Sequence, residues 1–451
     1  MILQNTKLKP RYATFAKIYH PINKGLVDTG LVLWFPGPNS FTGEDIIELQ
    51  VHGSPAIIKC LLKGIVETNL ARIAEPGEFT RRAFYNNKMD LAEVEGLRDL
   101  LNAETDIQRK QALAMSRGVQ SKKINEWISR LSDATSVIDG HIEFGDTDDV
   151  TINMADINTT LTQIQNELTQ AITTSAKGFT IKTGLNIALY GVTNVGKSSL
   201  LNALTSEDRA IVSDSPNTTR DLIQVRMDLN GYPVNLTDTA GFYNDPSHRI
   251  ETEAMKKSIE ILFDNNTAIH VLVISADIYL KYAMKYLSAK PAKILSEYVE
   301  DMFVSGLVRP ENENFQSLFV KNTIVVITKL DLIKSEDKTH FNELLQEKNV
   351  IGTSIVNNYG VDKLFDCFNQ QIKEIYYDFN PDDVQFNTIR TLEAVKKASQ
   401  CIQDAILVAD TAIDTKSHFM RATITHLSGI LGKTCSSDML DDIFENFCVG
   451  K

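Results

Sequence analysis

The sequence predicts a multidomain protein that combines α/β structure with an all-α domain. Three observations predict this arrangement. The length of 451 residues suits roughly three domains. Strand-like and helix-like segments alternate in residues 1–87 and 181–378. Apolar residues recur at helical spacing in residues 88–180 and 379–451. We therefore expect a small N-terminal α/β domain, followed by a helical domain that a second, inserted α/β domain splits in two.

The composition is that of an ordinary globular chain. Hydrophobic residues make up 43%, no apolar run reaches the roughly 18 residues of a membrane span, and the N-terminus is too polar for a signal peptide. Five scattered cysteines without a Cys-x-x-Cys pair are typical of a reducing compartment, so we expect a cytoplasmic protein without a membrane partner. The formal net charge of −12 does not favour nucleic-acid binding, although a local basic stripe can still bind phosphates.

In the N-terminal domain, apolar and polar side chains alternate over residues 46–53. Ile47, Leu49 and Val51 would face one way, whereas Glu48 and the other polar residues would face the opposite way. This pattern predicts a half-buried strand that presents one polar face.

The inserted domain contains a phosphate-binding loop. Residues 191–198 read Gly-Val-Thr-Asn-Val-Gly-Lys-Ser and fit the pattern Gly-x-x-x-x-Gly-Lys-Ser/Thr at every fixed position. A strand-like segment precedes the loop and a helix-like segment follows it, which argues against a chance glycine-rich turn. Lys197 would reach the β- and γ-phosphates, and the Ser198 hydroxyl would ligate Mg²⁺. The expected nucleotide contacts of this loop are Asn194, Val195, Gly196, Lys197, Ser198 and Ser199.

Two further segments complete a site for the γ-phosphate and Mg²⁺. Residues 238–241, Asp-Thr-Ala-Gly, follow a strand, so that Asp238 can hold Mg²⁺ through water and the Gly241 N–H can meet the γ-phosphate. Between this segment and the loop lies Thr219, which could ligate Mg²⁺ only while the γ-phosphate is present and would act as a switch. The expected contacts here are Asp238, Thr239, Ala240, Gly241, Thr218 and Thr219.

The base is expected to be guanine. Residues 328–331, Thr-Lys-Leu-Asp, end another strand, and a carboxylate at Asp331 can accept hydrogen bonds from guanine N1 and N2, a pair that adenine does not offer. The usual first residue of this motif is Asn, and the shorter Thr328 should brace the base and the phosphate loop less well. Lys329 belongs to the same motif, and Ser354 fits the last base-contacting loop. Four elements in order predict GTP binding.

The ends of the chain carry a more specific resemblance. Residues 447–451 read Phe-Cys-Val-Gly-Lys, and the N-terminal part contains motifs at residues 36–44, 52–53, 76–80, 82–84 and 88–91. In these motifs and in the order of its domains, the chain resembles the MnmE/TrmE family of bacterial and organellar tRNA modification GTPases over nearly its whole length.

The resemblance implies a function for each domain. The N-terminal domain (residues 1–87) would dimerise and bind 5-formyl- or 5,10-methylene-tetrahydrofolate, and Glu48, Lys88 and Lys451 would contact the folate. The helical domain (88–180 and 379–451) would carry Cys448, the first catalytic candidate, toward that pocket. The Ras-like G domain (181–378) would pair with that of a second subunit. With an FAD-containing MnmG/GidA partner, the family adds an aminomethyl or carboxymethylaminomethyl group at C5 of the tRNA wobble uridine.

The resemblance also implies how GTP is hydrolysed. Phe242 stands where Ras-like enzymes place a water-orienting Gln. The family instead uses a K⁺ ion, for which the expected ligands are Asn194, Ser213, Ser215 and Thr218. A carboxylate in the second switch orients the water, and alignment places His248 there, with Asp245 and Glu251 as neighbouring alternatives. Histidine carries no fixed negative charge, so we expect slow hydrolysis.

Several features depart from the family. The resemblance begins inside the N-terminal domain, so a leading strand and a folate-contacting Arg have no counterpart, and weaker folate binding is expected. Asn217 stands where the family has Gly, and residues 277–322 have no counterpart. Basic residues between 109 and 130 form either a tRNA-binding stripe or a solvated helical face.

Other interpretations remain open. Cys448 could be a buried thiol without a role, and the Cys-Val-Gly-Lys end is formally a prenylation box with a poor final residue. The chain could also be a GTP-switched RNA-binding or ribosome-assembly factor without modification chemistry. A third interpretation is a dimeric scaffold whose GTPase is inactive because the Glu is lost.

Overall fold

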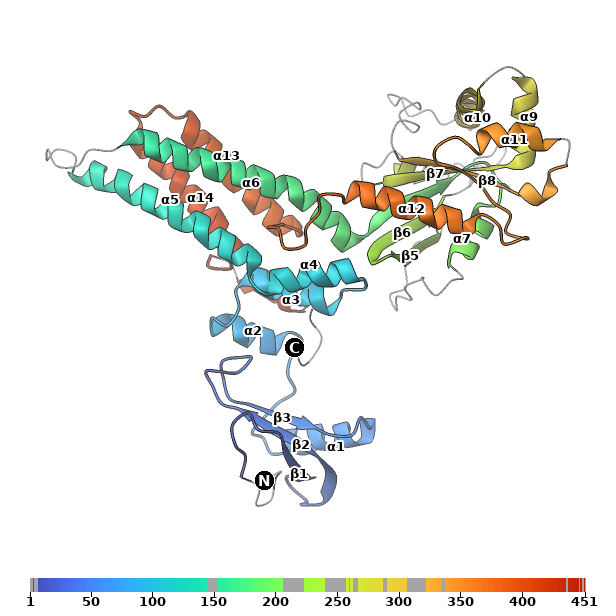
Figure 1. Cartoon of the computed structure of the whole chain (residues 1–451). Coiled ribbons are helices and arrows are strands. Elements are labelled where there is room, and N and C mark those ends of the chain that lie inside the picture. Colours follow the sequence, from blue (N-terminus) through green and yellow to red (C-terminus); the bar gives the residue numbers. More distant parts are fainter. Residues whose placement is uncertain are drawn as a thin grey trace. The chain divides into compact units, whose positions relative to one another are not determined.

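The computed structural model divides the chain into two compact units (Figure 1). The first comprises Met1–Asn102, Ala112–Thr173 and Asp382–Lys451, and the second comprises Ala103–Gln111 and Thr174–Pro381. The structure describes residues 3, 7–144, 153–205, 223–239, 257–258, 260–262, 267–286, 290–305, 322–334, 337–434, 437–445, 447 and 450. Within these ranges, no helix has both the length and the apolar character that a membrane crossing requires.

The first unit begins with a three-stranded antiparallel sheet in the order β1-β2-β3, formed by β1 (Thr14–Tyr19), β2 (Leu26–Phe35) and β3 (Ile46–Gln50). One face of the sheet packs against α1 (Pro55–Val66) around Ile18, Val32 and Leu61. Leu49 packs against this core and Glu48 is exposed, as the alternation in residues 46–53 predicts, whereas Ile47, which was expected on the same face as Leu49, is 60% exposed.

Two short helices and the last helix of the chain form a second cluster. α2 (Glu78–Tyr85) and α3 (Leu91–Leu101) pack against α15 (Ser437–Glu445). Asp90 and Glu93 form a capping box that starts α3. Phe444 lies against Phe84, and Phe447, with 6% of its surface exposed, belongs to the same apolar cluster as Met89. The helices α2, α3 and α15 therefore share one apolar cluster with Met89 and Phe447.

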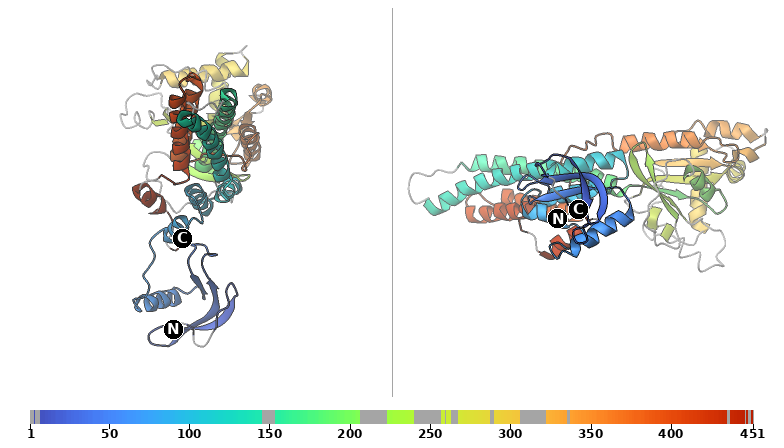
Figure 2. Two further views of the ribbon diagram at one scale, coloured as in Figure 1. Left: turned by 90° about the vertical axis from the view of Figure 1, so that its left-hand side faces the viewer. Right: turned by 90° about the horizontal axis from the view of Figure 1, so that it is seen from below.

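Four long helices build the helical part of the first unit (Figure 2). They are α5 (Val119–Phe144), the first part of α6 (Met154–Thr183), α13 (Ile389–Leu407) and α14 (Ile413–Ile430), which share one apolar core. The indole N–H of the buried Trp127 donates to Glu167 at 2.8 Å, joining α5 to α6. Segments on both sides of the inserted domain therefore form one helical core. The short helix α4 (Asp106–Ser116) lies partly in each unit.

A buried ion pair joins two helices through residues that are 295 positions apart in the sequence. Glu95 on α3 is 3% exposed and accepts from Arg390 Nε at 3.0 Å. Arg390 also donates to the carbonyls of Gly429 and Ile430 at the end of α14. Replacing Glu95 by Ala leaves the guanidinium without its partner, so the free energy of unfolding should fall by about 3 kcal/mol in a urea titration.

The matched control for this prediction is Glu67→Ala. Glu67 pairs with Lys63 on the exposed surface of α1 at 3.7 Å, where ion pairs contribute little. A Glu95→Leu/Arg390→Met double variant should recover part of the lost stability, because neither charge then remains unpaired. Equal, small changes in Glu95→Ala and Glu67→Ala would show that the buried pair does not stabilise the unit.

The second unit is built on a six-stranded sheet in the order β5-β6-β4-β7-β8-β9. The strands are β4 (Leu185–Tyr190), β5 (Ile223–Leu229), β6 (Tyr232–Asp238), β7 (Thr267–Ser275), β8 (Thr323–Thr328) and β9 (Val350–Gly352). β5 is antiparallel to β6, and the other neighbours are parallel. The carboxyl ends of β4, β6, β7 and β8 therefore share one edge, where ligands bind in open α/β sheets.

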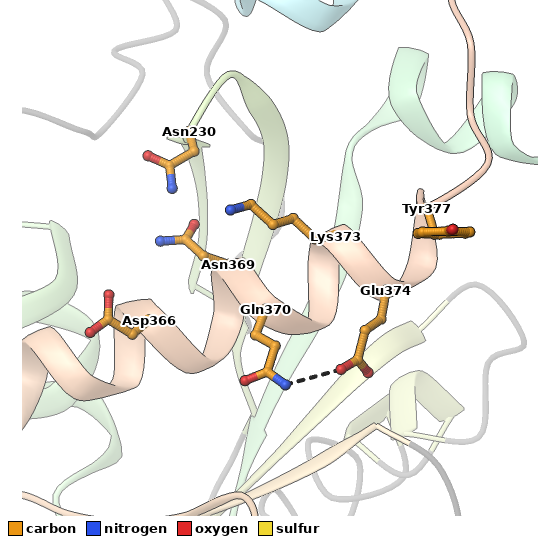
Figure 3. A pocket seen from close by; sticks show the side chains of 7 residues that line it. All are labelled: Asn230, Asp366, Asn369, Gln370, Lys373, Glu374 and Tyr377. Carbon is orange, nitrogen blue, oxygen red and sulfur yellow. Dashed lines mark hydrogen bonds between the residues drawn. The ribbon is translucent and has the colours of Figure 1, made fainter.

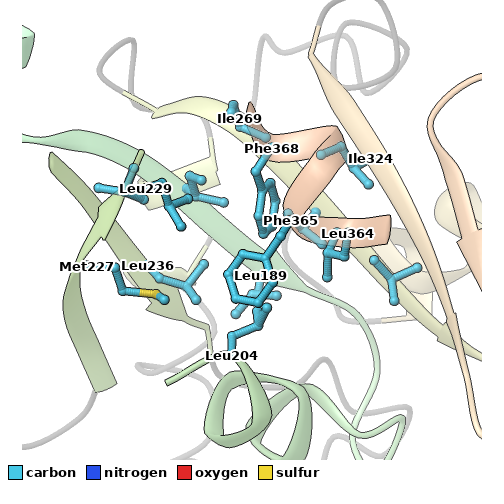
Figure 4. Packing of buried hydrophobic residues seen from close by; sticks show 14 of the residues in the cluster. Leu189, Leu204, Met227, Leu229, Leu236, Ile269, Ile324, Leu364, Phe365 and Phe368 are labelled. Atoms are coloured by element: carbon cyan, nitrogen blue, oxygen red, sulfur yellow. The ribbon is translucent and has the colours of Figure 1, made fainter. Parts of the chain in front are cut away.

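Helices cover both faces of this sheet. α7 (Lys197–Thr205) and α12 (Val361–Ile375) pack on one face, where Leu204 and Phe368 share an apolar core with Leu189 of β4 (Figure 4). α9 (Ala276–Lys285), α10 (Pro291–Ser305) and α11 (Lys338–Leu344) share the opposite core with Tyr190. Successive residues of β4 enter the two cores because side chains alternate along a strand. In its described part, the segment 277–322 thus contributes helices to one face of the sheet.

Candidate functional site

The phosphate loop connects β4 to α7 and requires glycine at its start. Gly191 has φ +153°, and a Cβ built there would lie 2.2 Å from the Val273 carbonyl oxygen. Asn194 and Gly196 also have positive φ values, +62° and +99°. These conformations curl the backbone tightly, so that N–H groups and the start of α7 can serve an anion.

Lys197 is folded back onto this loop. It is only 7% exposed, and its Nζ donates to the carbonyls of Gly191 at 3.1 Å and Val192 at 3.0 Å. Burial lowers the pKa of Lys197, and the nearby Asp238 carboxylate opposes that shift. A phosphate oxygen would be a better partner for the ammonium than these neutral carbonyls, so the arrangement suits a phosphate ligand.

Ser198 and Asp238 present oxygen atoms side by side. Ser198 Oγ donates to Asp238 Oδ2 at 2.7 Å, while Asp238 Oδ1 is buried and has no partner among the described residues. Burial raises the pKa of this carboxyl, whereas the Ser198 hydrogen bond and the Lys197 charge lower it. A hydroxyl and a carboxylate with a spare buried oxygen are the hard ligands that Mg²⁺ prefers, so the residues fit this ion. Ser199 follows as an exposed residue of α7.

Thr239 anchors the end of β6 to the strand that enters the phosphate loop. Its N–H and its Oγ1 both donate to the Leu189 carbonyl, at 3.1 Å and 2.8 Å. This fixes Asp238, the preceding residue, next to the loop.

The base-binding segment also contacts the phosphate loop. Thr328 Oγ1 donates to the Val195 carbonyl at 2.5 Å, and Lys329 Nζ donates to the Asn194 carbonyl at 2.7 Å. Thr328 therefore still braces the loop, although its side chain is shorter than the usual Asn. The Lys329 contact was not expected from the sequence.

Asp331 and Ser354 come together from two loops. Ser354 is 2% exposed, and its Oγ donates to Asp331 Oδ1 at 2.6 Å. The Leu330 N–H donates to the Thr353 carbonyl at 3.2 Å, which ties the same two loops. The Asp331 carboxylate is thus oriented while its residue stays exposed, as a base-binding group must be.

Many predicted residues lie outside the described part of the chain. In the G domain these are Ser213, Ser215, Thr218, Thr219, Ala240, Gly241 and His248, together with Asn217, Phe242, Asp245 and Glu251. Cys448 and Lys451 also lie outside it. Of the expected K⁺ ligands, the structure therefore places only Asn194.

The structure places the two described folate candidates in the first unit. Glu48 is exposed on β3, opposite Leu33 of β2. Lys88 is exposed just after α2, and a Cβ built at Gly43 would lie 3.2 Å from its Cε. Phe447 belongs to the apolar cluster that includes Met89, the residue after Lys88.

The basic residues between 109 and 130 do not form one free surface. Arg109 and Lys110 belong to the second unit and pair with Asp106 at 2.7 Å and 2.9 Å. Lys123 and Arg130 belong to the first unit and both pair with Glu167 at 2.8 Å. These pairs favour the solvated-face interpretation for all four side chains.

An open cavity of about 700 Å³, which the sequence does not indicate, lies on α12 (Figure 3). It lies beside Asn230, in the turn before β6, and so at the sheet edge opposite to Asp238. The residues that line it have polar or charged side chains, and none is a predicted nucleotide contact: Asn230, Asp366, Asn369, Gln370, Lys373, Glu374 and Tyr377.

Comparisons with known proteins identify the family of this chain. Residues 91–448 match the family model of the MnmE helical domain, and residues 1–88 match that of the GTP-binding protein TrmE N-terminus. The tRNA modification GTPase MnmE of Rickettsia bellii (strain RML369-C) is 33% identical over 451 residues, which is 100% of this chain and 93% of that protein.

Two other comparisons concern a nearly full-length relative and a solved G domain. The mitochondrial 5-taurinomethyluridine-[tRNA] synthase subunit GTPB3 of Danio rerio is 33% identical over 451 residues, covering 98% of this chain and 86% of that protein. The solved G domain of the T. maritima FeoB iron transporter covers 42% of this chain and 98% of its own, with 23% identity and a TM-score of 0.27, values too low to bear on the fold. The family models and the full-length identities show that the chain belongs to the MnmE/TrmE family of tRNA modification GTPases.

Proposed function

We propose that this chain hydrolyses GTP in the modification of the tRNA wobble uridine, adding an aminomethyl or carboxymethylaminomethyl group at C5. The observation that carries the GTPase part is the meeting of the phosphate loop, the Ser198–Asp238 pair and the Asp331–Ser354 pair at one edge of the sheet. The tRNA part is supported by the names of the relatives, which are tRNA-modifying proteins.

The described residues of the site serve different parts of the bound nucleotide. Lys197 exchanges its loop carbonyls for the β- and γ-phosphates, and Ser198 and Asp238 hold Mg²⁺, which neutralises developing charge on the phosphates when bound. Asp331, oriented by Ser354, accepts from guanine N1 and N2. Asn194 and switch residues 213, 215 and 218 would hold a K⁺ ion, which would supply positive charge near the transferred phosphoryl group. His248, Asp245 or Glu251 would orient the attacking water when two G domains pair.

The modification chemistry would take place at the first unit. Glu48, Lys88 and Lys451 bind 5-formyl- or 5,10-methylene-tetrahydrofolate, Cys448 takes part in the carbon transfer, and an MnmG/GidA-type FAD protein completes the complex with a homodimer of this chain. The apolar cluster that Phe447 shares with Met89 supports this proposal, because Phe447 precedes Cys448 and Met89 follows Lys88 in the sequence.

Nucleoside mass spectrometry of tRNA tests the proposal. In a strain that lacks this gene, the modified wobble uridine should be lost, and the intact gene should restore it. A Cys448→Ser variant should fail to restore it while GTP turnover of the purified protein stays within about twofold, because the G domain is a separate unit. The matched control is Cys401→Ser, a partly buried thiol on α13. Unchanged uridines in the deletion strain would instead favour a GTP-switched RNA-binding or assembly factor.

A further inference from the structure

The open cavity on α12 lies over the polar side of a helix whose other side is anchored in the core (Figure 3). Leu364, Phe368 and Ile372 are buried in the core of the second unit. The residues of α12 that line the cavity recur three or four positions apart from residue 366 onward, so they lie along the opposite side of the helix. This spacing gathers their side chains on one surface that is open to solvent.

Two features fix the walls of this cavity. Tyr376, the residue after α12, stacks on Tyr232 of β6 with ring centroids 5.2 Å apart and an interplanar angle of 14°. Asn230 and Gly231 form the two-residue turn between β5 and β6, and both have positive φ values, +53° and +88°. Asn-Gly is the pair that such tight hairpin turns prefer. The cavity is therefore a preformed part of the second unit, as ligand sites usually are.

Most polar groups of the lining are not used up by one another. Among the seven side chains that line the cavity, a hydrogen bond joins only Gln370 to Glu374, at 3.1 Å. Asn369 Oδ1 is buried and has no hydrogen-bond partner in the described part of the chain. In Figure 3 the Lys373 ammonium points to the same side of the helix as the Asn369 amide. An ammonium and an amide are thus available to a ligand.

The chemistry of these groups suits a nucleotide of unpaired RNA. An ammonium pairs with a phosphate, and amide groups both donate to and accept from base edges. The Tyr377 ring is 90% exposed and offers a face on which a base can stack. A free anion would fit less well, because the single ammonium of the lining is accompanied by the carboxylates of Asp366 and Glu374. The cavity volume of about 700 Å³ accommodates a ligand of nucleotide size.

A second group of charged residues borders the turn that closes the cavity. The Ile107 N–H, at the start of α4, donates to the Gly231 carbonyl at 3.2 Å. Arg109 and Lys110 follow on the same helix and pair with Asp106, which leaves one net positive charge beside the turn. This charge adds to the attraction of a phosphate backbone.

We propose that this cavity binds one unstacked nucleotide of the tRNA, with its phosphate at Lys373, its base on the Tyr377 ring and the edge of the base at Asn369. The tRNA would then contact the second unit at the edge of the sheet opposite to the phosphate loop. The inference rests on the tRNA part of the proposed function and names the surface that part requires.

Fluorescence anisotropy of the full-length protein with a labelled, in vitro transcribed tRNA that carries a wobble uridine tests the inference. Lys373→Ala should raise the Kd about fivefold, and the slope of log Kd against log salt concentration should fall by about 1, because one phosphate contact is lost. Tyr377→Ala should raise the Kd about tenfold, whereas Tyr377→Phe keeps the ring and should bind like the wild type. GDP affinity should stay unchanged in these variants, because none of them alters the nucleotide site.

Lys363→Ala is the matched control, because Lys363 is an exposed lysine of α12 that does not line the cavity. It should keep both the Kd and the salt slope of the wild type. Weakening equal to that of Lys373→Ala would assign the effect to the general charge of the helix. Unchanged Kd values in Lys373→Ala and Tyr377→Ala would show that the tRNA does not enter the cavity. Competition by free UMP as strong as by unlabelled tRNA would assign the cavity to a free nucleotide instead.

The wobble-uridine assay separates this inference from the proposed function. If the deletion strain loses the modified uridine while both cavity variants bind tRNA normally, only the inference is wrong. If the variants bind tRNA more weakly while the deletion strain keeps the modified uridine, the cavity is an RNA site and the modification function is wrong. A wild type that does not bind the tRNA overturns the inference, whatever the deletion strain shows.

Discussion

Lys197→Ala is expected to lower GTP turnover by about 10²–10³-fold, the loss that follows when one preorganised donor to developing charge is removed. Lys197 is the buried cation of the phosphate loop, and its present partners are two neutral carbonyls that it can leave at little cost. In the G domain, the variant should keep its sheet and helices, because the ammonium lies at the edge of the core rather than in it.

Steady-state phosphate release in KCl and MgCl₂ measures this effect. The control is Lys177→Ala, which removes a lysine of the same unit that pairs with Asp378 on the surface. Its turnover should match the wild type. Comparable turnover in Lys197→Ala and the wild type would place hydrolysis elsewhere, and the same assay in NaCl tests the proposed K⁺ requirement.

Asp331→Asn is expected to change the preferred base. The carboxylate accepts two hydrogen bonds from guanine, whereas the amide presents a donor toward guanine N2, so GDP affinity should fall by about 10²-fold or more. Xanthine carries an oxygen in place of that amino group and can accept from the amide, so XDP should bind the variant better than GDP. Ser354, which orients Oδ1 of Asp331 at 2.6 Å, can equally donate to the amide oxygen.

Competition between fluorescent GDP and unlabelled XDP measures the switch. Asp362→Asn, at an exposed position in the first turn of α12, is the matched control and should keep the preference for GDP. A variant at Asp331 that still prefers GDP to XDP would mean that this carboxylate does not contact the base.

The parts of the site that local chemistry determines could be predicted from the sequence. The phosphate loop follows from fixed residues within eight positions, because Gly191 and Gly196 must adopt positive φ values. The strand at residues 46–50 was predicted from its alternation and is present, although its two faces are not cleanly divided, because Leu49 packs at the core and Ile47 is exposed. Membership of the MnmE/TrmE family was predicted from the terminal motifs, and the family models confirm it.

Features that depend on contacts between distant residues could not be predicted. The sequence gives no reason to pair Glu95 with Arg390, 295 residues away. Nor does it show that Thr328 reaches the Val195 carbonyl, since that depends on how closely two loops approach. The segment 277–322 had no recognised pattern, and only packing reveals that α9 and α10 share an apolar core with Tyr190. The domain boundaries after residues 87, 180 and 378 stay predictions, as do the folate, K⁺ and MnmG/GidA assignments.

Calorimetric titration of the full chain with GDP and with ADP in the presence of Mg²⁺ tests the central claim most directly. Because Asp331 can pair with guanine and not with adenine, GDP should bind at one site per chain, and ADP should bind at least about 10²-fold more weakly. Equal affinities for the two nucleotides, or no heat with either, would contradict a guanine-nucleotide site at this edge of the sheet.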